Sequence, residues 1–296
     1  MLIPVDFFKN RFFEDEHGIF VLNKSDAYSE NFGKQWKEYS DIQIDSKNNF
    51  SISKDFLESL LFGTIDELSG LQVLEIGSGA GRFTEHLVKV SKTCISVDMS
   101  SAVYHNVAKG AKNLSLVKAD LLKLEPKRLF DVVICRGVLQ HTPDPLLSIL
   151  KLHTFIKKGG IVYFDIYPMP KIGYLHPKYF FWRPILQNLI SYEELESFLK
   201  KHIKFLLKLK RGLKTIFFNS NFISDSLIPV WDYYGEIDLS LKQLEEWAIL
   251  DTLDGIYAKH DHPKSFKTVK KLLLKNNIEI LNCDEKNNYF KTTNLI

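Results

Sequence analysis

The stretch Val73-Leu-Glu-Ile-Gly77-Ser-Gly79-Ala-Gly81-Arg-Phe-Thr84 decides the fold of this chain. It begins with a short apolar run typical of a buried strand, continues through a glycine turn and ends in residues that suit a helix. Glycines in such a turn let the backbone approach a ligand closely. Their spacing is G-x-G-x-G, whereas a dinucleotide fingerprint reads G-x-G-x-x-G, so that a helix N-terminus faces a pyrophosphate. The turn therefore favours a ligand without phosphates, and a sheet that binds NAD or no ligand is the alternative.

The pattern of the glycine turn continues as far as Ile166, because short apolar runs alternate there with helical patterns. Such alternation is typical of βαβ units in a parallel sheet. The helix before the last strand is predicted to begin at Asp144-Pro145, where Asp can cap and Pro suits the first position, and to end at Gly159-Gly160. The predicted strands are Val73–Ile76, Thr93–Val97, Leu114–Lys118, Phe130–Cys135 and Ile161–Ile166.

The regular pattern stops after Ile166 and resumes at His262-Pro263. An apolar helical stripe then begins at Phe266, and two strands, Ile278–Cys283 and Tyr289–Thr293, are predicted to close the chain as a hairpin. We expect four segments: an N-terminal cap over residues 1–62, a ligand-binding α/β core over 63–166, an inserted substrate-binding cap over 167–262, and a C-terminal helix and hairpin over 263–296 that complete the core.

Carboxylates occur at the ends of successive predicted strands. Asp98 ends the second strand, where the hydroxyls of a ribose lie in this kind of sheet. Asp120 follows the third strand and would either face an adenine amino group or cap the next helix. Glu75 lies two residues before Gly77 and would either hold an amino group of the ligand or satisfy backbone amides of the turn.

The glycine turn, Asp98, Asp120 and the final hairpin, in this order, resemble the class I S-adenosylmethionine-dependent methyltransferases. The resemblance covers residues from about 71 to 166 and the tail from about 265. It implies a Rossmann-like α/β fold, with a seven-stranded, mostly parallel sheet, an antiparallel last strand and helices on both faces, and S-adenosylmethionine across the carboxyl ends of the first strands. The cofactor-binding residues that it implies are Glu75, Gly77, Ser78, Gly79, Gly81, Asp98, Met99, Asp120, Leu121 and Arg136.

The segment Phe130-Asp-Val-Val-Ile-Cys-Arg136-Gly-Val-Leu-Gln140-His141-Thr-Pro-Asp-Pro145 looks like the fourth-strand motif of methyltransferases that act on small molecules. It lacks the Asn/Asp-Pro-Pro-aromatic tetrapeptide of many enzymes that methylate planar nitrogens. His141 follows the strand where the methyl acceptor is expected, so it could remove a proton from an acceptor hydroxyl. It would otherwise shape the site or cap a turn.

Two segments outside the core resemble, more loosely, elements of bacterial methyltransferases linked to surface-sugar or secondary-metabolite synthesis. They are Phe32–Trp36 and Leu244–Tyr257. Gln35 and its neighbour Trp36 would close over the cofactor or serve only in packing. Asp254 and Tyr257 are candidates for contact with the substrate.

A capping box at Ser191-Tyr-Glu-Glu194 predicts the start of a long helix inside the insertion. This helix combines many lysines with regularly spaced apolar residues. The lysines are interpreted as a solvated helix face, or alternatively as contacts to a lipid-linked or phosphorylated substrate.

Composition narrows the partners further. The chain has 39 basic and 36 acidic side chains, and a net charge of +3 does not indicate a polyanion, so we expect no DNA partner and disfavour RNA. Cys94, Cys135 and Cys283 have no CxxC spacing and are predicted to be reduced core residues, without a metal. No signal peptide or apolar run of about 20 residues is evident, so we expect a cytoplasmic protein that could touch a membrane surface.

The sequence thus predicts an S-adenosylmethionine-dependent methyltransferase that methylates an oxygen of a sugar or other small metabolite. Methylation of nitrogen or carbon is a weaker alternative. Two rival hypotheses are a catalytically silent binding partner with the same fold and an RNA methyltransferase that uses the lysine-rich insertion. The acceptor and the oligomeric state are left open.

Overall fold

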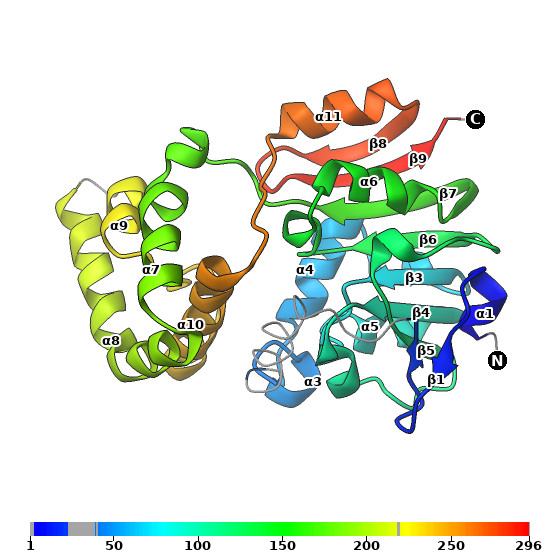
Figure 1. Cartoon of the computed structure of the whole chain (residues 1–296), viewed down its shortest axis with the longest axis horizontal. Helices are drawn as coiled ribbons and strands as arrows, with labels where there is room; N and C mark the ends of the chain where they lie inside the picture. Colours follow the sequence, from blue (N-terminus) through cyan, green and yellow to red (C-terminus); the bar gives the residue numbers. More distant parts are fainter. Residues whose placement is uncertain (1–2, 23–38, 40, 218–219, 296) are drawn as a thin grey trace. The chain divides into compact units, whose positions relative to one another are not determined.

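A computed structural model describes residues 3–22, 39, 41–217 and 220–295 of the chain. The chain divides into two compact units (Figure 1). The first comprises Met1–Met169 together with His260–Ile296, and the second comprises Pro170–Lys259. The second unit is thus inserted into the first, between Met169 and His260.

The first unit is built on a sheet whose strands run in the order β1-β2-β5-β4-β3-β6-β7-β9-β8 (Figure 1). Neighbouring strands from β2 to β7 are parallel, whereas β9 is antiparallel to both β7 and β8. The predicted mostly parallel sheet with an antiparallel last strand is therefore confirmed. The strands are β1 (Phe13–Glu14), β2 (Phe20–Val21), β3 (Gln72–Ile76), β4 (Thr93–Asp98), β5 (Leu114–Lys118), β6 (Phe130–Cys135), β7 (Ile156–Asp165), β8 (Ile278–Asp284) and β9 (Tyr289–Asn294).

Helices cover both faces of this sheet, as the sequence predicts. Alternate residues of a strand point to opposite faces, and in β3 Leu74 belongs to one hydrophobic cluster whereas Val73 belongs to the other. The first cluster includes residues of α6 and α11, and the second includes residues of α4 and α5. The helices of this unit are α1 (Pro4–Phe7), α3 (Asp45–Asn48), α4 (Ile52–Leu61), α5 (Thr84–Val90), α6 (Pro145–His153) and α11 (Phe266–Lys275).

The N-terminal segment does more than cap the core. Its strand β2 pairs with β5, so the sheet has nine strands among the described residues instead of the expected seven. The ring of Phe7 stacks on that of Phe130 with centroids 4.6 Å apart. Strands of two residues carry no detectable periodicity, which is why the sequence did not reveal β1 and β2.

Helix α6 begins as predicted and ends earlier. The Asp144 carboxylate accepts hydrogen bonds from the backbone N–H groups of Leu146 and Leu147, and Pro145 occupies the first turn. The helix stops at His153, and β7 already starts at Ile156, so the predicted end at Gly159-Gly160 is wrong. The glycines lie inside β7 near a register shift against β6, an irregularity that glycine commonly marks in a strand.

The second unit is helical. Ser191 and Glu194 form the predicted capping box at the start of α8 (Tyr192–Ile216). The Arg183 guanidinium donates to the carbonyl oxygens of Gly255 and Ala258, so it ties α7 to the last turn of α10 and beyond. The other helices are α7 (Arg183–Leu189), α9 (Asn221–Leu227) and α10 (Leu241–Tyr257). No described helix combines the length and the apolar character needed to cross a bilayer.

The chain leaves and re-enters the first unit at adjacent points. Pro168 and Lys264 form a parallel bridge. The Lys264 N–H donates to the Tyr167 carbonyl at 3.0 Å, and the Met169 N–H donates to the Lys264 carbonyl at 3.2 Å. These bonds hold the two connecting segments, one leading into the second unit and one leading out of it, side by side within the first unit.

Candidate functional site

The glycine turn lies at the carboxyl end of β3, where its backbone requires glycine. Gly77, Gly79 and Gly81 all have positive φ angles, which side-chain-bearing residues rarely adopt. A Cβ atom on Gly77 would lie 2.0 Å from Cγ2 of Val138. Because the turn is packed this closely against the segment after β6, the two predicted motifs meet at one end of the sheet.

Asp98 closes the adjacent strand β4 and reaches the glycine turn. Its Oδ2 accepts a 2.7 Å hydrogen bond from the Gly79 N–H, and its Oδ1 accepts from both the N–H and the hydroxyl of Ser100. Desolvation raises the pKa of Asp98 above its ordinary value, although these hydrogen bonds act in the opposite direction. The structure thus brings together two elements that the sequence analysis assigns to one cofactor.

Glu75 is buried beside the turn with one of its oxygens unsatisfied. Oε2 accepts hydrogen bonds from the hydroxyls of Thr84 and Ser96, at 2.7 and 2.5 Å. Oε1 has no hydrogen-bond partner among the described residues. The Glu75 carboxylate thus contacts hydroxyls. The alternative in which it satisfies backbone amides of the glycine turn is not what the described residues show. Burial, opposed by the two hydroxyls, raises the pKa of Glu75 to about 7.

A second orphaned oxygen lies in the turn itself. The hydroxyl of Ser78 is buried without a partner in the described part of the chain, whereas its N–H donates to the Val97 carbonyl. Buried polar atoms nearly always find a hydrogen-bond partner, so orphans often mark a place for a ligand. Ser78 and Glu75 together fit a ligand that brings hydrogen-bond donors into the turn.

The other predicted cofactor residues line neighbouring strand ends. Asp120 caps the short turn Leu121–Lys123 by accepting from the Leu122 N–H at 2.9 Å, which is the alternative that the sequence analysis left open. Leu121 is buried in the core, and Met99 is half-buried after β4. Contact of these three residues with a cofactor stays a prediction.

Arg136 follows β6 within a cage of aromatic rings. Its guanidinium lies 5.0 Å from the ring centroid of Phe56 and 5.3 Å from that of Tyr289, and it donates to the Tyr289 hydroxyl at 2.7 Å. Its Nε is buried and has no partner among the residues described. Cation–π contacts of this kind hold a guanidinium in place, so Arg136 is a fixed positive charge at this end of the sheet.

His141 ends the turn Leu139–His141, and its ring is oriented by two neighbours. Its Nδ1 lies 3.0 Å from the carbonyl oxygen of His260, and its ring packs edge-on against Tyr167 with centroids 5.7 Å apart. A carbonyl can only accept, so Nδ1 must carry a proton. In the neutral ring the lone pair is then on Nε2.

Three buried polar side chains at this end of the first unit were not predicted from the sequence. Gln140 is fully buried, and neither its Oε1 nor its Nε2 has a partner among the described residues. Asp165, at the end of β7, accepts from the Gly137 N–H at 2.6 Å, and burial raises its pKa. Asn288 is fully buried with Oδ1 unsatisfied. Gln140 follows the apolar Val138-Leu139 and Asp165 ends an apolar strand, whereas Asn288 lies in a polar turn and carried no signal in the sequence.

Four predicted residues are not placed in this site. Gln35 lies outside the described residues, as does Trp36. Asp254 and Tyr257 lie in α10 of the second unit, where the Tyr257 hydroxyl donates to the Ile190 carbonyl at 2.7 Å. Their contact with a substrate stays a prediction.

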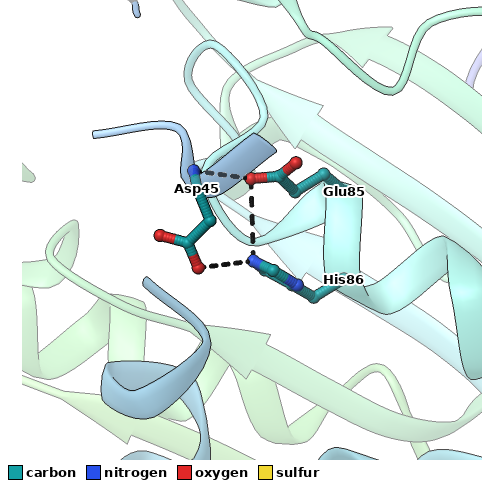
Figure 2. A group of neighbouring side chains, drawn as sticks. All are labelled: Asp45, Glu85 and His86. Atoms are coloured by element: carbon teal, nitrogen blue, oxygen red, sulfur yellow. Dashed lines mark hydrogen bonds and ion pairs between the residues drawn. The ribbon is translucent and has the colours of Figure 1, made fainter. Parts of the chain in front are cut away.

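A buried group of Asp45, Glu85 and His86 fastens the N-terminal segment to the helix after the glycine turn (Figure 2). His86 Nε2 lies 2.9 Å from Asp45 Oδ2 and 3.6 Å from Glu85 Oε1. These ligand types suit a metal ion, but both carboxylates already accept backbone N–H groups, those of Ser53 and Lys54 among them. Burial alone would raise the pKa of Asp45, yet these hydrogen bonds hold it below its ordinary value. We interpret the group as a structural anchor.

The cysteines differ from one another. Cys94 and Cys135 are buried in β4 and β6, as predicted, whereas Cys283 is exposed. The prediction of three core cysteines is therefore wrong for Cys283, because it lies on β8, the strand at the edge of the sheet.

Comparison with known proteins supports one family. Residues 74–164 match the family model of a methyltransferase domain. Two curated relatives are the ubiquinone biosynthesis O-methyltransferases of Colwellia psychrerythraea, 32% identical over 110 residues, and of Pseudomonas syringae pv. tomato, 34% identical over 110 residues. Each match covers 34% of this chain, and 45% and 47% of those proteins. The chain thus spans about half the length of these relatives.

Parts of the chain also align with solved structures. The complex of DhpI with SAM and HEP is 26% identical, with a TM-score of 0.37, over 46% of this chain and 63% of that one. The N-methyltransferase NodS from Bradyrhizobium japonicum with S-adenosylhomocysteine is 22% identical, with a TM-score of 0.37, over 47% of this chain and 74% of that one. Both scores are too low to support an inference about function.

Proposed function

We propose that this chain, whose residues 74–164 match the model of a methyltransferase domain, is a class I S-adenosylmethionine-dependent methyltransferase that transfers a methyl group to an oxygen of a small-molecule acceptor. The observation that carries the proposal is the pair of acidic side chains at the glycine turn. Asp98 bonds to Gly79 within the turn, and Glu75 keeps one buried oxygen without a partner.

The residues present fit S-adenosylmethionine. Asp98 would accept hydrogen bonds from the ribose hydroxyls, because a carboxylate has more lone pairs than its present partners use. Glu75 Oε1 would receive the positively charged amino group. A cation beside Glu75 would lower its raised pKa and favour the ionised form. Asp120 would contact the adenine in addition to capping its turn.

His141 is the proposed general base. When bound, the cofactor would supply an electrophilic methyl group on its sulfonium sulfur, which passes to the acceptor oxygen as the S–C bond breaks and S-adenosylhomocysteine leaves as the neutral thioether. The proton of the acceptor hydroxyl would pass to Nε2 of His141 as the new C–O bond forms. The His260 carbonyl orients the ring and stabilises the imidazolium by accepting from Nδ1. Apart from this proton transfer, the protein has to align the acceptor oxygen with the methyl group. Alignment does not require further acid–base residues.

Oxygen as the methylated atom is supported by the names of the curated relatives, which are O-methyltransferases. The absence of the tetrapeptide typical of planar-nitrogen methylation agrees with it. A sugar or another small metabolite is the proposed acceptor class. We assign acceptor choice to the second unit, because it is a compact body of its own that lies outside the matched domain.

Calorimetric titration with S-adenosylmethionine and S-adenosylhomocysteine tests the cofactor site. Wild type should bind both, and Asp98→Ala should lose most of this affinity. Asp144→Ala is the matched control, since it removes a carboxylate that caps α6 in the same unit. Absence of binding by the folded wild type would refute the proposal. Binding without turnover on any acceptor hydroxyl would favour a catalytically silent partner.

A further inference from the structure

Helix α8 of the second unit has two apolar faces. One face is buried among the helices of its own unit and includes Leu195, Leu199, Ile203 and Leu207. The other is exposed and consists of Phe198, Phe205, Leu209 and Ile216, with exposed fractions of 49, 63, 43 and 69%. We name these four residues the outer stripe. An ordinary surface helix has one apolar face, directed at the core, so the outer stripe needs another explanation.

The outer stripe is continuous along the helix. Successive members are seven, four and seven residues apart, and at 3.6 residues per turn all four fall within an arc of about 40°. The stripe extends for about 27 Å, because an α-helix rises about 1.5 Å per residue. Scattered exposed apolar residues are normal in proteins, whereas an aligned row of large ones marks an interaction site.

Lysines border the outer stripe along one edge. Lys201, Lys204 and Lys208 are exposed and follow the stripe on the same side of the helix. From Lys200 to Lys214 the helix carries seven basic and no acidic side chains. Two of the seven, Lys210 and Arg211, form ion pairs with Asp225 and Asp232 inside the unit, so the positive charge beside the stripe comes mainly from the exposed lysines at its edge. A partner on this face must therefore present apolar groups to the stripe and negative charge beside it.

From this juxtaposition we propose that α8 lays the outer stripe onto the surface of an anionic lipid bilayer. A surface-bound helix places its apolar residues at the boundary of headgroups and acyl chains, while its lysines contact anionic headgroups. The buried face of α8, centred about 120° around the helix from the stripe, is held by contacts with α9 and α10, so the helix can lie flat on the bilayer without leaving its unit (Figure 1). This inference goes beyond the proposed methyl transfer and does not depend on it.

Co-sedimentation of the full-length protein with lipid vesicles tests the proposal. The neutral vesicles contain phosphatidylcholine alone, and the anionic vesicles contain phosphatidylcholine with about 30% phosphatidylglycerol, which supplies the negative charge. Wild type should bind the anionic vesicles in preference to the neutral ones. Phe205→Ser/Leu209→Ser should reduce binding at least about tenfold, and Lys201→Glu/Lys208→Glu should reduce it more, since each lysine near the surface contributes about fivefold. All substituted residues are exposed, so circular dichroism should report an unchanged fold.

Matched control variants lie on α11 of the first unit. Leu274→Ser removes an equally exposed apolar residue, and Lys270→Glu/Lys271→Glu reverses two exposed charges. Both should bind vesicles as wild type does. The proposal is overturned if wild type does not sediment with anionic vesicles, or if the control variants lose binding as the stripe variants do. It is also overturned if the stripe mediates a dimer in the absence of lipid, detected by analytical ultracentrifugation as a dimer that Phe205→Ser/Leu209→Ser dissociates.

Discussion

Nδ1 of His141 lies 3.0 Å from the carbonyl oxygen of His260, although 119 residues separate the two along the chain. This contact joins the segment after β6 to the residue at which the chain re-enters the first unit. It fixes the tautomer of the ring with its lone pair on Nε2, the form that a general base requires.

Replacement of His141 tests that role. His141→Gln should lower kcat by about a hundredfold or more, because loss of a general base typically costs this much. The affinity for S-adenosylhomocysteine should stay near that of wild type, since His141 is not assigned to the cofactor. His105→Gln, at an exposed position of the same unit, is the control. An unchanged kcat in His141→Gln would contradict the assignment of His141 as the general base.

Glu75 should make the protein less stable as the pH rises. Its pKa is about 7 in the folded state and 4.5 as the ordinary value, so between these values the folded protein binds more protons than the unfolded chain. The contribution of Glu75 to the free energy of unfolding should therefore fall by up to about 3 kcal/mol from pH 4.5 to pH 7. Glu75→Gln should remove this decline in urea unfolding, whereas Glu16→Gln, at an exposed position, should retain it. Equal pH dependence in Glu75→Gln and wild type would contradict the assignment.

His153 should act in the opposite direction. It is buried, and desolvation lowers its pKa to about 4. Between this value and 6.5 the unfolded chain binds more protons, so the contribution of His153 to stability falls by up to about 3 kcal/mol as the pH drops through this window. His153→Gln should show a weaker loss of stability between pH 6.5 and pH 4 than wild type. His17→Gln, on the surface, should match wild type, and a loss in His153→Gln as steep as in wild type would refute this account.

The buried amide of Gln140 should lower the free energy of unfolding and, if it contacts a ligand, should strengthen ligand binding. A buried amide without partners is unfavourable, so Gln140→Leu should raise the free energy of unfolding by about 1 kcal/mol or more. If the amide contacts a bound ligand, the same variant should raise KM for the acceptor or weaken cofactor binding. Gln187→Leu is the contrasting control, because Gln187 already donates to the Ile256 carbonyl and its loss should destabilise. A destabilised Gln140→Leu would show that the amide has a partner inside the protein.

The sequence predicts the central strands well because burial on both faces leaves continuous apolar runs. Val73–Ile76 and Phe130–Cys135 are nearly of this kind, each interrupted by one carboxylate, and their bounds agree with β3 and β6 to within one residue. The start of β7 was missed because Lys157, Lys158 and two glycines occupy it, and these residues do not resemble a strand. Tertiary pairing with β6 overrides local propensity there.

The candidate site was predictable where backbone geometry demands particular residues. Gly77 and Gly81 are required by positive φ angles and close contacts, so their pattern was visible in the sequence. Gln140 has no such signature, because its importance arises from burial without a partner. The outer stripe of α8 was hidden for a related reason. Periodicity shows that residues share a helix face, but only the packing of the unit shows which face is covered.

The bridge between Pro168 and Lys264 has a further consequence. The ends of the inserted unit are joined within the first unit, so the sheet does not need the intervening chain to hold them together. Insertions whose ends lie side by side can be replaced without disturbing the host domain. The second unit should therefore behave as an exchangeable cassette, whose sequence evolution or protein engineering can change while the sheet of the first unit stays unaltered.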